Sequence, residues 1–304
     1  MILIVGEALV DLATKVDGSV EAHLGGGPFN AARAVARLGG AAAFCGVLSN
    51  DSFGRRLAAA LVAEGVDVTP SPTVALPTTL ALAELDAAGH ASYRFYIEGT
   101  TVPALTPSLA LDRLPAAIDA VLVGSLGLLL EPAAAAAEAI VSTLKGQALV
   151  MVDPNVRPLV IADRDRYLER LHRVIASADV VKLSVEDLDW MYPGSEVADA
   201  ARSLLDRGPR LVMITAGETG AYVATPVGIE VVGAPPVTVV DTIGAGDTFS
   251  GAVLAWWVAE GRPDLGDPTA ALAAAGFAVV AAAVNCSRAG ADPPTRDEID
   301  RFVS

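Results

Sequence analysis

Short apolar runs alternate with helix-like segments along most of the chain, and this alternation restricts the fold more than any other feature. The apolar runs have the length and composition of strands and cover residues 2–5, 42–47, 121–124, 148–152, 180–183 and 211–215. Helix-like segments lie between most of them, at residues 30–38, 55–63, 132–144, 166–177 and 197–207. Such alternation is typical of a mostly parallel sheet with helices on both faces. We therefore expect a doubly wound α/β fold.

Two regions interrupt the alternation with the period-two pattern of antiparallel strands. Residues about 9–24 contain an Asp-Gly pair, and residues about 74–103 contain an Ala-Gly pair, each between alternating apolar positions. Short turns of this kind join the two strands of a hairpin. Such hairpins fit poorly inside a parallel sheet, so we expect a small separate sheet that covers a site as a lid. An ordinary hairpin at the edge of the main sheet is the alternative.

The charge balance argues against a nucleic-acid-binding surface. The 304 residues include 21 Lys and Arg against 36 Asp and Glu, a formal charge of −15, whereas nucleic acids are bound by clustered cations. A smaller phosphate-bearing ligand would have to be held locally, by backbone N–H groups and a few cations. The cations available for this are Arg94, Arg157, Lys182 and Arg288.

The sequence shows no signal for export or for a membrane span, and we expect a cytoplasmic protein. The first apolar run has no basic region before it and is typical of a strand rather than a signal peptide. The longest apolar run, residues 270–284, has 15 residues and predicts a buried core helix, because a spanning helix needs about 18 or more. Cys45 and Cys286 lie far apart in apolar surroundings, which indicates free thiols.

A glycine-rich helix start carries the clearest chemical signal. In DTIGAGDTFSGAVLAWW, residues 241–257, Gly244 and Gly246 permit backbone angles that point successive N–H groups the same way. The partial positive charge of the helix N-terminus adds to them, which predicts an anion hole suited to a phosphoryl group. Asp247 stands beside it, where a kinase needs a base to take the proton from an attacking hydroxyl.

The residues of this segment do not fit two other phosphate-binding motifs. A dinucleotide-binding fingerprint needs a small residue where Phe249 stands. A Walker A loop needs a Gly-Lys pair, which occurs nowhere in the sequence. A helix start that is shaped by glycines and capped by Asp247, with no chemical role, stays open on this segment alone.

A second glycine cluster lies near the start of the chain, in HLGGGPFNAARAVARLGG. Glycines at residues 25–27 precede Pro28, a residue favoured at the first helical position, and Asn30 faces the same helix end. A glycine loop lets the backbone approach a small ligand closely, and an Asn amide can both donate to and accept from a hydroxyl. A plain turn into an amphipathic helix is the alternative.

The two clusters together resemble the PfkB or ribokinase-like family of carbohydrate kinases. GGGPFNAARAVARLGG is similar to the N-terminal signature of that family, and DTIGAGDTFSGAVL matches its C-terminal signature almost residue for residue. The resemblance extends from GEALVDL to CSRAGA and so covers nearly the whole chain. It implies one ribokinase-like domain over residues 1–304, with a central sheet, a lid of β-strands, ATP as phosphoryl donor and Mg²⁺.

The resemblance also implies roles for particular residues. Asp247 would be the base that activates a sugar hydroxyl, and the anion hole would consist of Gly244, Ala245 and Gly246. The sugar site would contain Asp11, Gly26, Gly27 and Asn30. A short carboxylate after the first strand, such as Asp11, can accept hydrogen bonds from two sugar hydroxyls. MVDPNVRP resembles the DxNxR element of the family, with Asp153, Asn155 and Arg157 at a strand end that faces the crevice.

Two further segments resemble nucleotide-binding elements of the family. VKLSVEDLDWMYPG contains Lys182 and corresponds to a stretch that usually carries an NxxE motif linked to Mg²⁺ and phosphate. Here Ser184 stands in place of the Asn and Asp187 in place of the Glu, so Glu186 or Asp187 would hold the metal through a water molecule. TAGETGAY resembles the nucleotide loop, which implies ATP binding by Thr215, Gly217 and Gly220.

Within the family, GEALVDL, YRFYIEGT, DPNVRP and KLSVEDLDWMYPG look most similar to bacterial fructokinases. This implies transfer of the γ-phosphoryl group of ATP to the 6-hydroxyl of D-fructose. The 2-keto-3-deoxygluconate kinases, which share DxNxR, and the ribokinases are the alternatives, and Arg94 on the lid could bind the carboxylate of a sugar acid. A non-catalytic sugar or nucleotide sensor on the same fold is the alternative from another class.

Two more expectations concern assembly and ions. Exposed lid strands often pair with a copy of themselves, so we expect a homodimer. A monovalent cation such as K⁺ activates some members of the family, and the loop near Asp241 and Ser287 would hold it.

Overall fold

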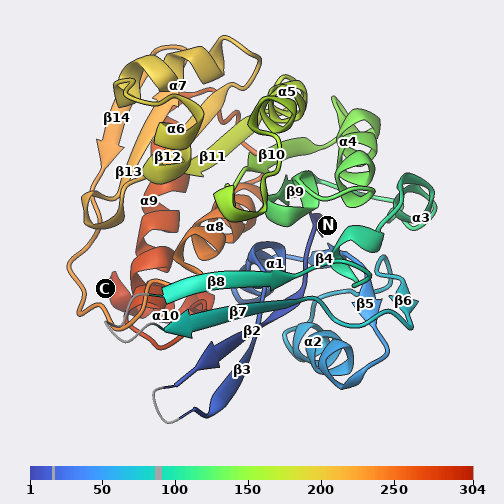
Figure 1. Ribbon diagram of the computed structural model, residues 1–304. Helices are drawn as coiled ribbons and strands as arrows, with labels where there is room; N and C mark the ends of the chain where they lie inside the picture. The colour runs from blue at the N-terminus through green and yellow to red at the C-terminus, as the bar shows by residue number, and fades with distance from the viewer. Residues whose placement is uncertain (16–17, 86–90, 304) are drawn as a thin grey trace.

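The computed structural model describes residues 1–15, 18–85 and 91–303. Its main sheet consists of β1 (Ile2–Val5), β4 (Ala42–Cys45), β9 (Ala120–Gly124), β10 (Leu149–Asp153), β11 (Val180–Ser184), β12 (Leu211–Thr215), β13 (Ala221–Thr225) and β14 (Gly228–Val232). The order is β14-β13-β12-β11-β10-β9-β1-β4 (Figure 1). The strands from β4 to β12 are parallel, and β13 and β14 complete one edge in antiparallel orientation.

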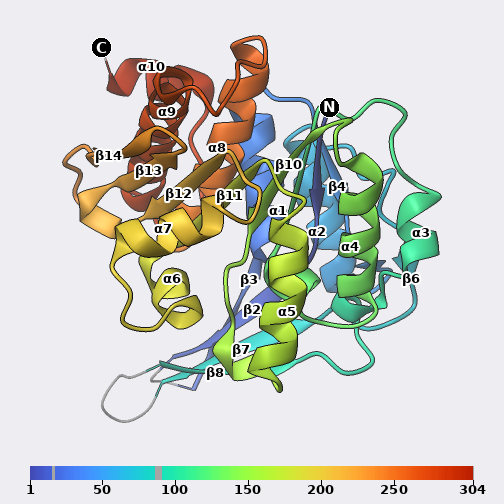
Figure 2. The ribbon, with the colours of Figure 1, turned by 90° about the horizontal axis from the view of Figure 1, so that it is seen from above.

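Helices cover both faces of this sheet (Figure 2). One face carries α1 (Gly27–Arg37), α2 (Ser52–Ala63), α8 (Ala245–Ala259), α9 (Pro268–Cys286) and α10 (Arg296–Phe302). The other carries α3 (Pro107–Leu111), α4 (Ala133–Leu144), α5 (Arg164–Ile175), α6 (Val185–Met191) and α7 (Val197–Leu205). Strand side chains alternate between the two cores, so Ile4 of β1 packs in the first and Leu3 in the second. The predicted doubly wound α/β fold is confirmed.

The predicted core helix at residues 270–284 is α9, which extends past the apolar run at both ends. By length and composition its 19 residues could cross a membrane, but half of its apolar stretch is buried in the protein. It packs against α8, β13 and β14. The apolar composition of α9 is therefore explained by its position in the core.

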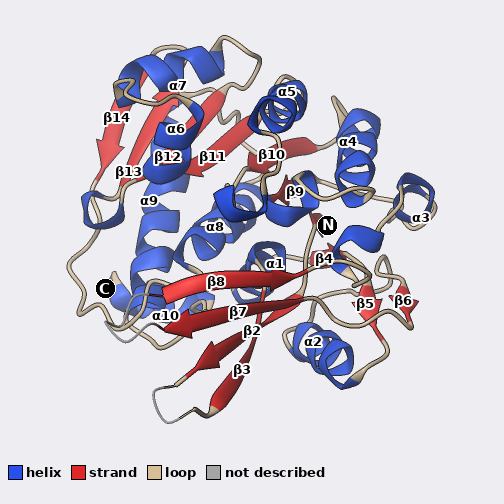
Figure 3. Cartoon of the chain, viewed as in Figure 1, coloured by secondary structure: helices blue, strands red, loops and turns tan. Residues whose placement is uncertain are grey.

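A second sheet of four strands stands apart from the main sheet (Figure 3). Its order is β3-β2-β7-β8, made from β2 (Leu9–Thr14), β3 (Val20–Gly25), β7 (Leu80–Leu85) and β8 (Ala91–Tyr96). The predicted hairpins are the antiparallel pairs β2–β3 and β7–β8, and β2 and β7 join them in parallel. We call these four strands the lid sheet.

The second hairpin of the lid is shorter than predicted at both ends, since its strands begin at Leu80 and end at Tyr96 instead of covering residues 74–103. Residue 74 belongs to β6 (Thr73–Val74), which pairs with β5 (Leu48–Ser49) in a separate two-stranded sheet. The predicted Ala-Gly turn at residues 86–89, and residue 17 of the Asp-Gly turn, lie outside the described residues.

The strand order reverses direction between β1 and β9. From β1 the chain proceeds to β4 on one side, whereas β9, β10, β11 and β12 follow one another on the other side. Open α/β sheets bind ligands at the carboxyl ends of the strands beside such a reversal. The topology therefore points to the ends of β1 and β9 as the place of the site.

Candidate active site

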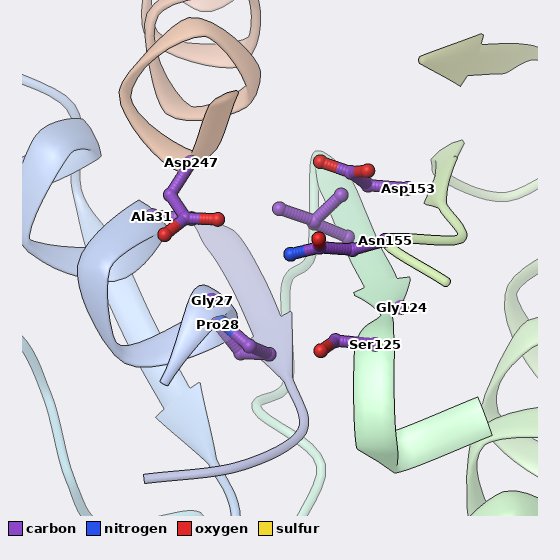
Figure 4. Close-up of a pocket in the computed structure, with 9 residues that line it drawn as sticks. Gly27, Pro28, Ala31, Gly124, Ser125, Asp153, Asn155 and Asp247 are labelled. Carbon is purple, nitrogen blue, oxygen red and sulfur yellow. The ribbon is translucent and has the colours of Figure 1, made fainter. Parts of the chain in front are cut away.

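A cavity lies at this reversal, between the carboxyl ends of β9 and β10 and the first turns of α1 and α8 (Figure 4). It is lined by Gly27, Pro28, Ala31, Leu122, Gly124, Ser125, Asp153, Asn155 and Asp247. Both glycine clusters found in the sequence contribute to it, although about 220 residues separate them.

Asp247 reaches the cavity from the first turn of α8 (Figure 4). Asn30, in the first turn of α1, donates a hydrogen bond from Nδ2 to Asp247 Oδ2 over 2.9 Å. Burial raises the pKa of Asp247 to about 6, although the Asn30 hydrogen bond and the charge of Lys182 lower it. A carboxylate with this pKa is mostly ionised at neutral pH and can still take a proton, as a general base must.

The start of α8 is built for close approach of the backbone to a ligand. Gly244 begins the helix in the left-handed conformation, with φ of 75°, and no described side chain caps its N–H groups. The N–H of Ala245 donates to the carbonyl oxygen of Thr242 over 3.2 Å, whereas the N–H groups of Gly244 and Gly246 have no such backbone partner among the described residues and are available to an anion. A Cβ added at Gly246 would lie 2.8 Å from Nζ of Lys182, so a charged group lies beside the predicted anion hole.

Lys182 is a buried cation in a small polar network. Its Nζ lies 3.0 Å from Asp153 Oδ2, which also accepts a 2.8 Å hydrogen bond from the Ser250 hydroxyl. Burial alone would lower the pKa of Lys182, but Asp153 and Asp187 raise it, so the ammonium group stays charged. The resemblance implied a nucleotide-binding role for Lys182, and the structure places its charge beside the helix start that would face the phosphoryl group.

The first glycine cluster brings the backbone against three polar side chains. A Cβ added at Gly25 would lie 2.3 Å from Asp11 Oδ2. A Cβ added at Gly27 would lie 3.1 Å from both Asn155 Nδ2 and Asp247 Oδ1. The cluster therefore brings Asp11 and Asn155 to the same loop as the predicted base.

Asp11 and Arg157 complete this side of the site. Asp11 lies on β2 of the lid sheet, where burial raises its pKa and the charges of His23 and Arg157 lower it. The guanidinium group of Arg157 also lowers the pKa of Glu7 and Asp247. The charge of Arg157 thus lowers the pKa of three carboxyl groups, which come from the lid sheet, the loop after β1 and α8.

The predicted nucleotide residues Thr215, Gly217 and Gly220 lie together at the carboxyl end of β12, two strands away from β10. Gly217 has φ of 53° and Gly220 φ of 96°, which favour glycine at both positions. None of the three lines the cavity around Asp247. Binding of ATP by this loop stays a prediction.

The segment predicted to hold a metal caps a helix. Ser184 and Asp187 form a capping box at the start of α6, in which each side chain accepts from the backbone N–H of the other. Asp187 Oδ1 also accepts the N–H of Val156 over 2.8 Å, and Glu186 is exposed. In the described part of the chain, no three Asp, Glu, His or Cys side chains gather to hold a metal ion. Metal binding through water by Glu186 or Asp187 stays a prediction.

The strand register places Arg94 away from the predicted sugar residues. Asp11 pairs with Ala81, and Ala81 pairs with Phe95, so these three side chains lie on one face of the lid sheet. Arg94 pairs with Leu82 and therefore lies on the other face, where it is exposed. The structure does not bring Arg94 to the cavity.

The loops predicted to hold a monovalent cation are adjacent. The Asp241 carboxylate accepts the N–H of Ile243 over 3.0 Å and that of Gly290 over 2.8 Å. The Ser287 hydroxyl donates to the carbonyl oxygen of Val284 over 2.7 Å. Cation binding at this place stays a prediction.

The sequence analysis missed two polar residues of the site, Glu7 and Ser125. Glu7 is 2% exposed just after β1, and Ser125 is 4% exposed at the end of β9. The sequence does contain a signal for Glu7, because a carboxyl group within the apolar run ILIVGEALV is costly to bury without a role. It contains none for Ser125, since a Gly-Ser pair after a strand predicts only a turn.

The sequence and the fold are both similar to those of known carbohydrate kinases. Residues 1–297 match the pattern of the pfkB family carbohydrate kinases. A fructokinase from Rhizobium leguminosarum bv. trifolii is 36% identical over 259 residues, which are 84% of this chain and 79% of that protein. The fructokinase of Vibrio cholerae O395, solved with fructose, ADP and calcium ion, has a TM-score of 0.89 at 28% identity and covers 100% of this chain and 98% of its own. The aminoimidazole riboside kinase of Salmonella enterica, solved with aminoimidazole riboside and an ATP analog, has a TM-score of 0.88 at 29% identity, covering 100% and 99%.

Proposed function

The chain belongs to the pfkB family of carbohydrate kinases, and on that premise we propose that it phosphorylates D-fructose at the 6-hydroxyl with ATP. The observation that carries the proposal is the 2.9 Å hydrogen bond from Asn30 to Asp247, which joins the amide predicted to bind the sugar to a buried carboxylate that lines the cavity. The fructokinases among its relatives, and the fructose bound in one structural neighbour, support fructose as the acceptor.

The transfer requires a base and an anion hole, and the protein forms no covalent bond to the substrates. Asp247 takes the proton of the attacking hydroxyl, and the hydroxyl oxygen forms a bond to the γ-phosphorus. The bond between that phosphorus and the β–γ bridging oxygen breaks, and ADP leaves with the electron pair. The backbone N–H groups of Gly244 and Gly246, with the charge of Lys182 beside them, stabilise the negative charge on the transferred group.

Sugar binding falls to residues on both sides of the glycine cluster. Asp11 and Asn30 accept from and donate to non-reacting hydroxyls, Gly26 and Gly27 let the backbone approach, and Arg157 balances the surrounding carboxylates. Because Asp11 belongs to the lid sheet, a sugar that contacts it draws this sheet toward the main sheet and its helices. Closure excludes water and so suppresses ATP hydrolysis.

We propose Mg²⁺ as the divalent ion and K⁺ at Asp241 and Ser287. The donor chemistry fits Mg²⁺ at the cavity, since Asp153 Oδ1 is buried there without a hydrogen-bond partner among the described residues. Asp187 and Glu186 would contribute through water. When bound, the ion neutralises charge on the phosphate oxygens.

We also propose that two copies assemble through their lid sheets and act in the cytoplasm. β3 and β8 are the edges of the lid sheet in the described chain, and an unpaired strand edge is a template for a second chain. Both cysteines are free thiols, as in a reducing compartment. Light scattering in solution tests the dimer.

The function is tested by measuring ADP release with a panel of acceptors: D-fructose, D-ribose, 2-keto-3-deoxygluconate and aminoimidazole riboside. We expect the highest kcat/KM with fructose. Aminoimidazole riboside is included because the Salmonella enterica kinase, whose TM-score is 0.88, was solved with it bound. A kcat/KM for any other acceptor that is about 10-fold above that for fructose would overturn the assignment, and binding without turnover would favour a sensor.

A further inference from the structure

Ser125 occupies the cavity wall in a backbone conformation that serine rarely adopts. Its φ is 52°, and among the described non-glycine residues only Asn155 and Arg262 also have positive φ. Two of these three residues line the cavity that contains Asp247. Left-handed angles at side-chain-bearing residues persist only where the surrounding structure holds them, and they gather at ligand sites.

The ends of β9 and β10 hold Ser125 in this conformation. The Ser125 N–H donates to the carbonyl oxygen of Pro154 over 3.1 Å. The preceding residue, Gly124, is so close to β10 that an added Cβ would lie 1.9 Å from the carbonyl oxygen of Asp153. A glycine at position 125 would satisfy this geometry without strain, so the presence of a serine points to its hydroxyl.

The Ser125 hydroxyl has hydrogen-bonding capacity that the protein does not use. Ser125 Oγ is buried and completes no hydrogen bond with a described residue, and the same holds for Oε2 of Glu7. The two groups are neighbours: burial raises the pKa of Glu7 to about 7, and the Ser125 hydroxyl is near enough to lower it. Buried polar atoms without a protein partner obtain one from solvent or ligand.

The charge state of Glu7 determines whether the Ser125 hydroxyl donates a hydrogen bond to Glu7 and accepts one from a ligand. An ionised carboxylate only accepts hydrogen bonds, so toward an ionised Glu7 the Ser125 hydroxyl can act only as a donor. The lone pairs of Ser125 Oγ then remain for a donor in the cavity. A sugar hydroxyl is such a donor, whereas a deoxygenated carbon or an ether oxygen is not.

We propose that Ser125 determines acceptor specificity, by accepting a hydrogen bond from a sugar hydroxyl other than the one that reacts at Asp247, with Glu7 as the positioning residue. Figure 4 shows Ser125 and Asp247 on different walls of the cavity, from the turn that follows β9 and from α8. This inference rests on the proposed sugar-kinase function. It assigns a role to two residues that neither glycine cluster contains.

The test compares D-fructose with its 1-deoxy, 3-deoxy and 4-deoxy analogues at pH 8, for the wild type and for Ser125→Ala. In the wild type one analogue should lose about 10-fold in kcat/KM relative to fructose, the effect of one hydrogen bond. In Ser125→Ala the ratio for that analogue should return to about 1, because its hydroxyl has lost its partner. Unchanged ratios for all three analogues would overturn the proposal.

Ser125→Gly separates recognition from folding. It removes the hydroxyl as Ser125→Ala does, but it also removes the strain of the left-handed conformation. We expect it to lose the same discrimination while its Tm exceeds that of Ser125→Ala. Discrimination like that of the wild type in Ser125→Gly would show that the serine has only a structural role.

Glu7→Gln tests the positioning role. A glutamine can turn its amide toward Ser125, so the hydroxyl no longer has one fixed orientation. We expect weaker discrimination among the analogues and a higher KM for fructose, with the KM for ATP unchanged. A higher KM for ATP alone would contradict the assignment. If the wild type does not phosphorylate fructose, the proposed acceptor is wrong. The role of Ser125 is then tested with deoxy analogues of whichever acceptor gives the highest kcat/KM in the ADP-release assay.

Discussion

The Asn30 amide donates to the Asp247 carboxylate over 2.9 Å and so joins the first turns of α1 and α8, which lie 217 residues apart in the chain. The hydrogen bond orients the base and favours its ionised form, while burial favours the protonated form. Asp247 therefore stays ionised at neutral pH with a pKa close to the physiological range. The predictions below follow from this balance and from the packing around it.

Asp247→Asn should lower kcat by about 100-fold or more, because the amide cannot take the proton of the attacking hydroxyl. The dissociation constants of ATP and sugar, measured by calorimetry, should change little. Asp267→Asn is the matched control, since Asp267 caps α9 and asparagine caps a helix equally well. Near-normal turnover of Asp247→Asn would sink the base assignment.

The kcat should fall as the pH drops below about 6, because burial raises the pKa of Asp247 to about 6 and the base works only when ionised. Asn30→Ala removes a hydrogen bond that lowers this pKa. The acid limb of its pH profile should therefore move to higher pH. A limb that stays in place, or moves to lower pH, would show that another group controls it.

Gly27→Ala should lower kcat/KM by about 10- to 100-fold, since small misplacements of reacting groups are costly. The added Cβ would lie 3.1 Å from Asn155 Nδ2 and from Asp247 Oδ1 and must push both groups aside. Gly276→Ala is the control: it lies within α9, where an added Cβ meets nothing within 4 Å. That variant should keep its activity and gain about 0.5–1 kcal/mol of stability. Equal activities of the two variants would contradict the close approach at Gly27.

Lys182→Met should lower the free energy of unfolding at pH 7 by about 3–5 kcal/mol, because Asp153 loses its buried cationic partner. The double variant Lys182→Met/Asp153→Asn should regain much of this loss, since the amide is neutral and still accepts from Ser250. Denaturant titrations of both variants give the comparison. A double variant that is no more stable than Lys182→Met would show that the pair is not coupled.

Local patterns were sufficient to predict the six parallel strands of the main sheet, most of the helices and the strands of both hairpins, but not β13 and β14, the antiparallel edge of the main sheet. They could not predict that β2 and β7 pair in parallel and join the hairpins into one sheet. That pairing is set by residues about 70 positions apart, and no turn specifies it. Arg94 shows the same limit, because a strand position faces the site or solvent according to a register that the sequence does not reveal.

The residues of the site also divide into those with a local sequence signal and those that depend on tertiary packing. Asp247, Asn30 and the glycine clusters were predictable because helix starts and glycine loops have local signatures. The contact of Ser250 with Asp153 spans 97 residues and depends on how α8 packs across β10. The proposed role of Ser125 follows from its φ of 52° and from its Oγ, which lacks a hydrogen-bond partner among the described residues, and neither property can be read from a sequence.

The dependence of the site on both glycine clusters has a consequence for synthesis on the ribosome. At about 5–20 residues per second, roughly 10–40 s pass between the emergence of Asn30 and that of Asp247. The face of α1 that packs on α8, including the fully buried Ala34, lacks α8 as a partner during this interval. This face therefore stays exposed for most of the synthesis of the chain, and enzymatic activity cannot begin before Asp247 has been made.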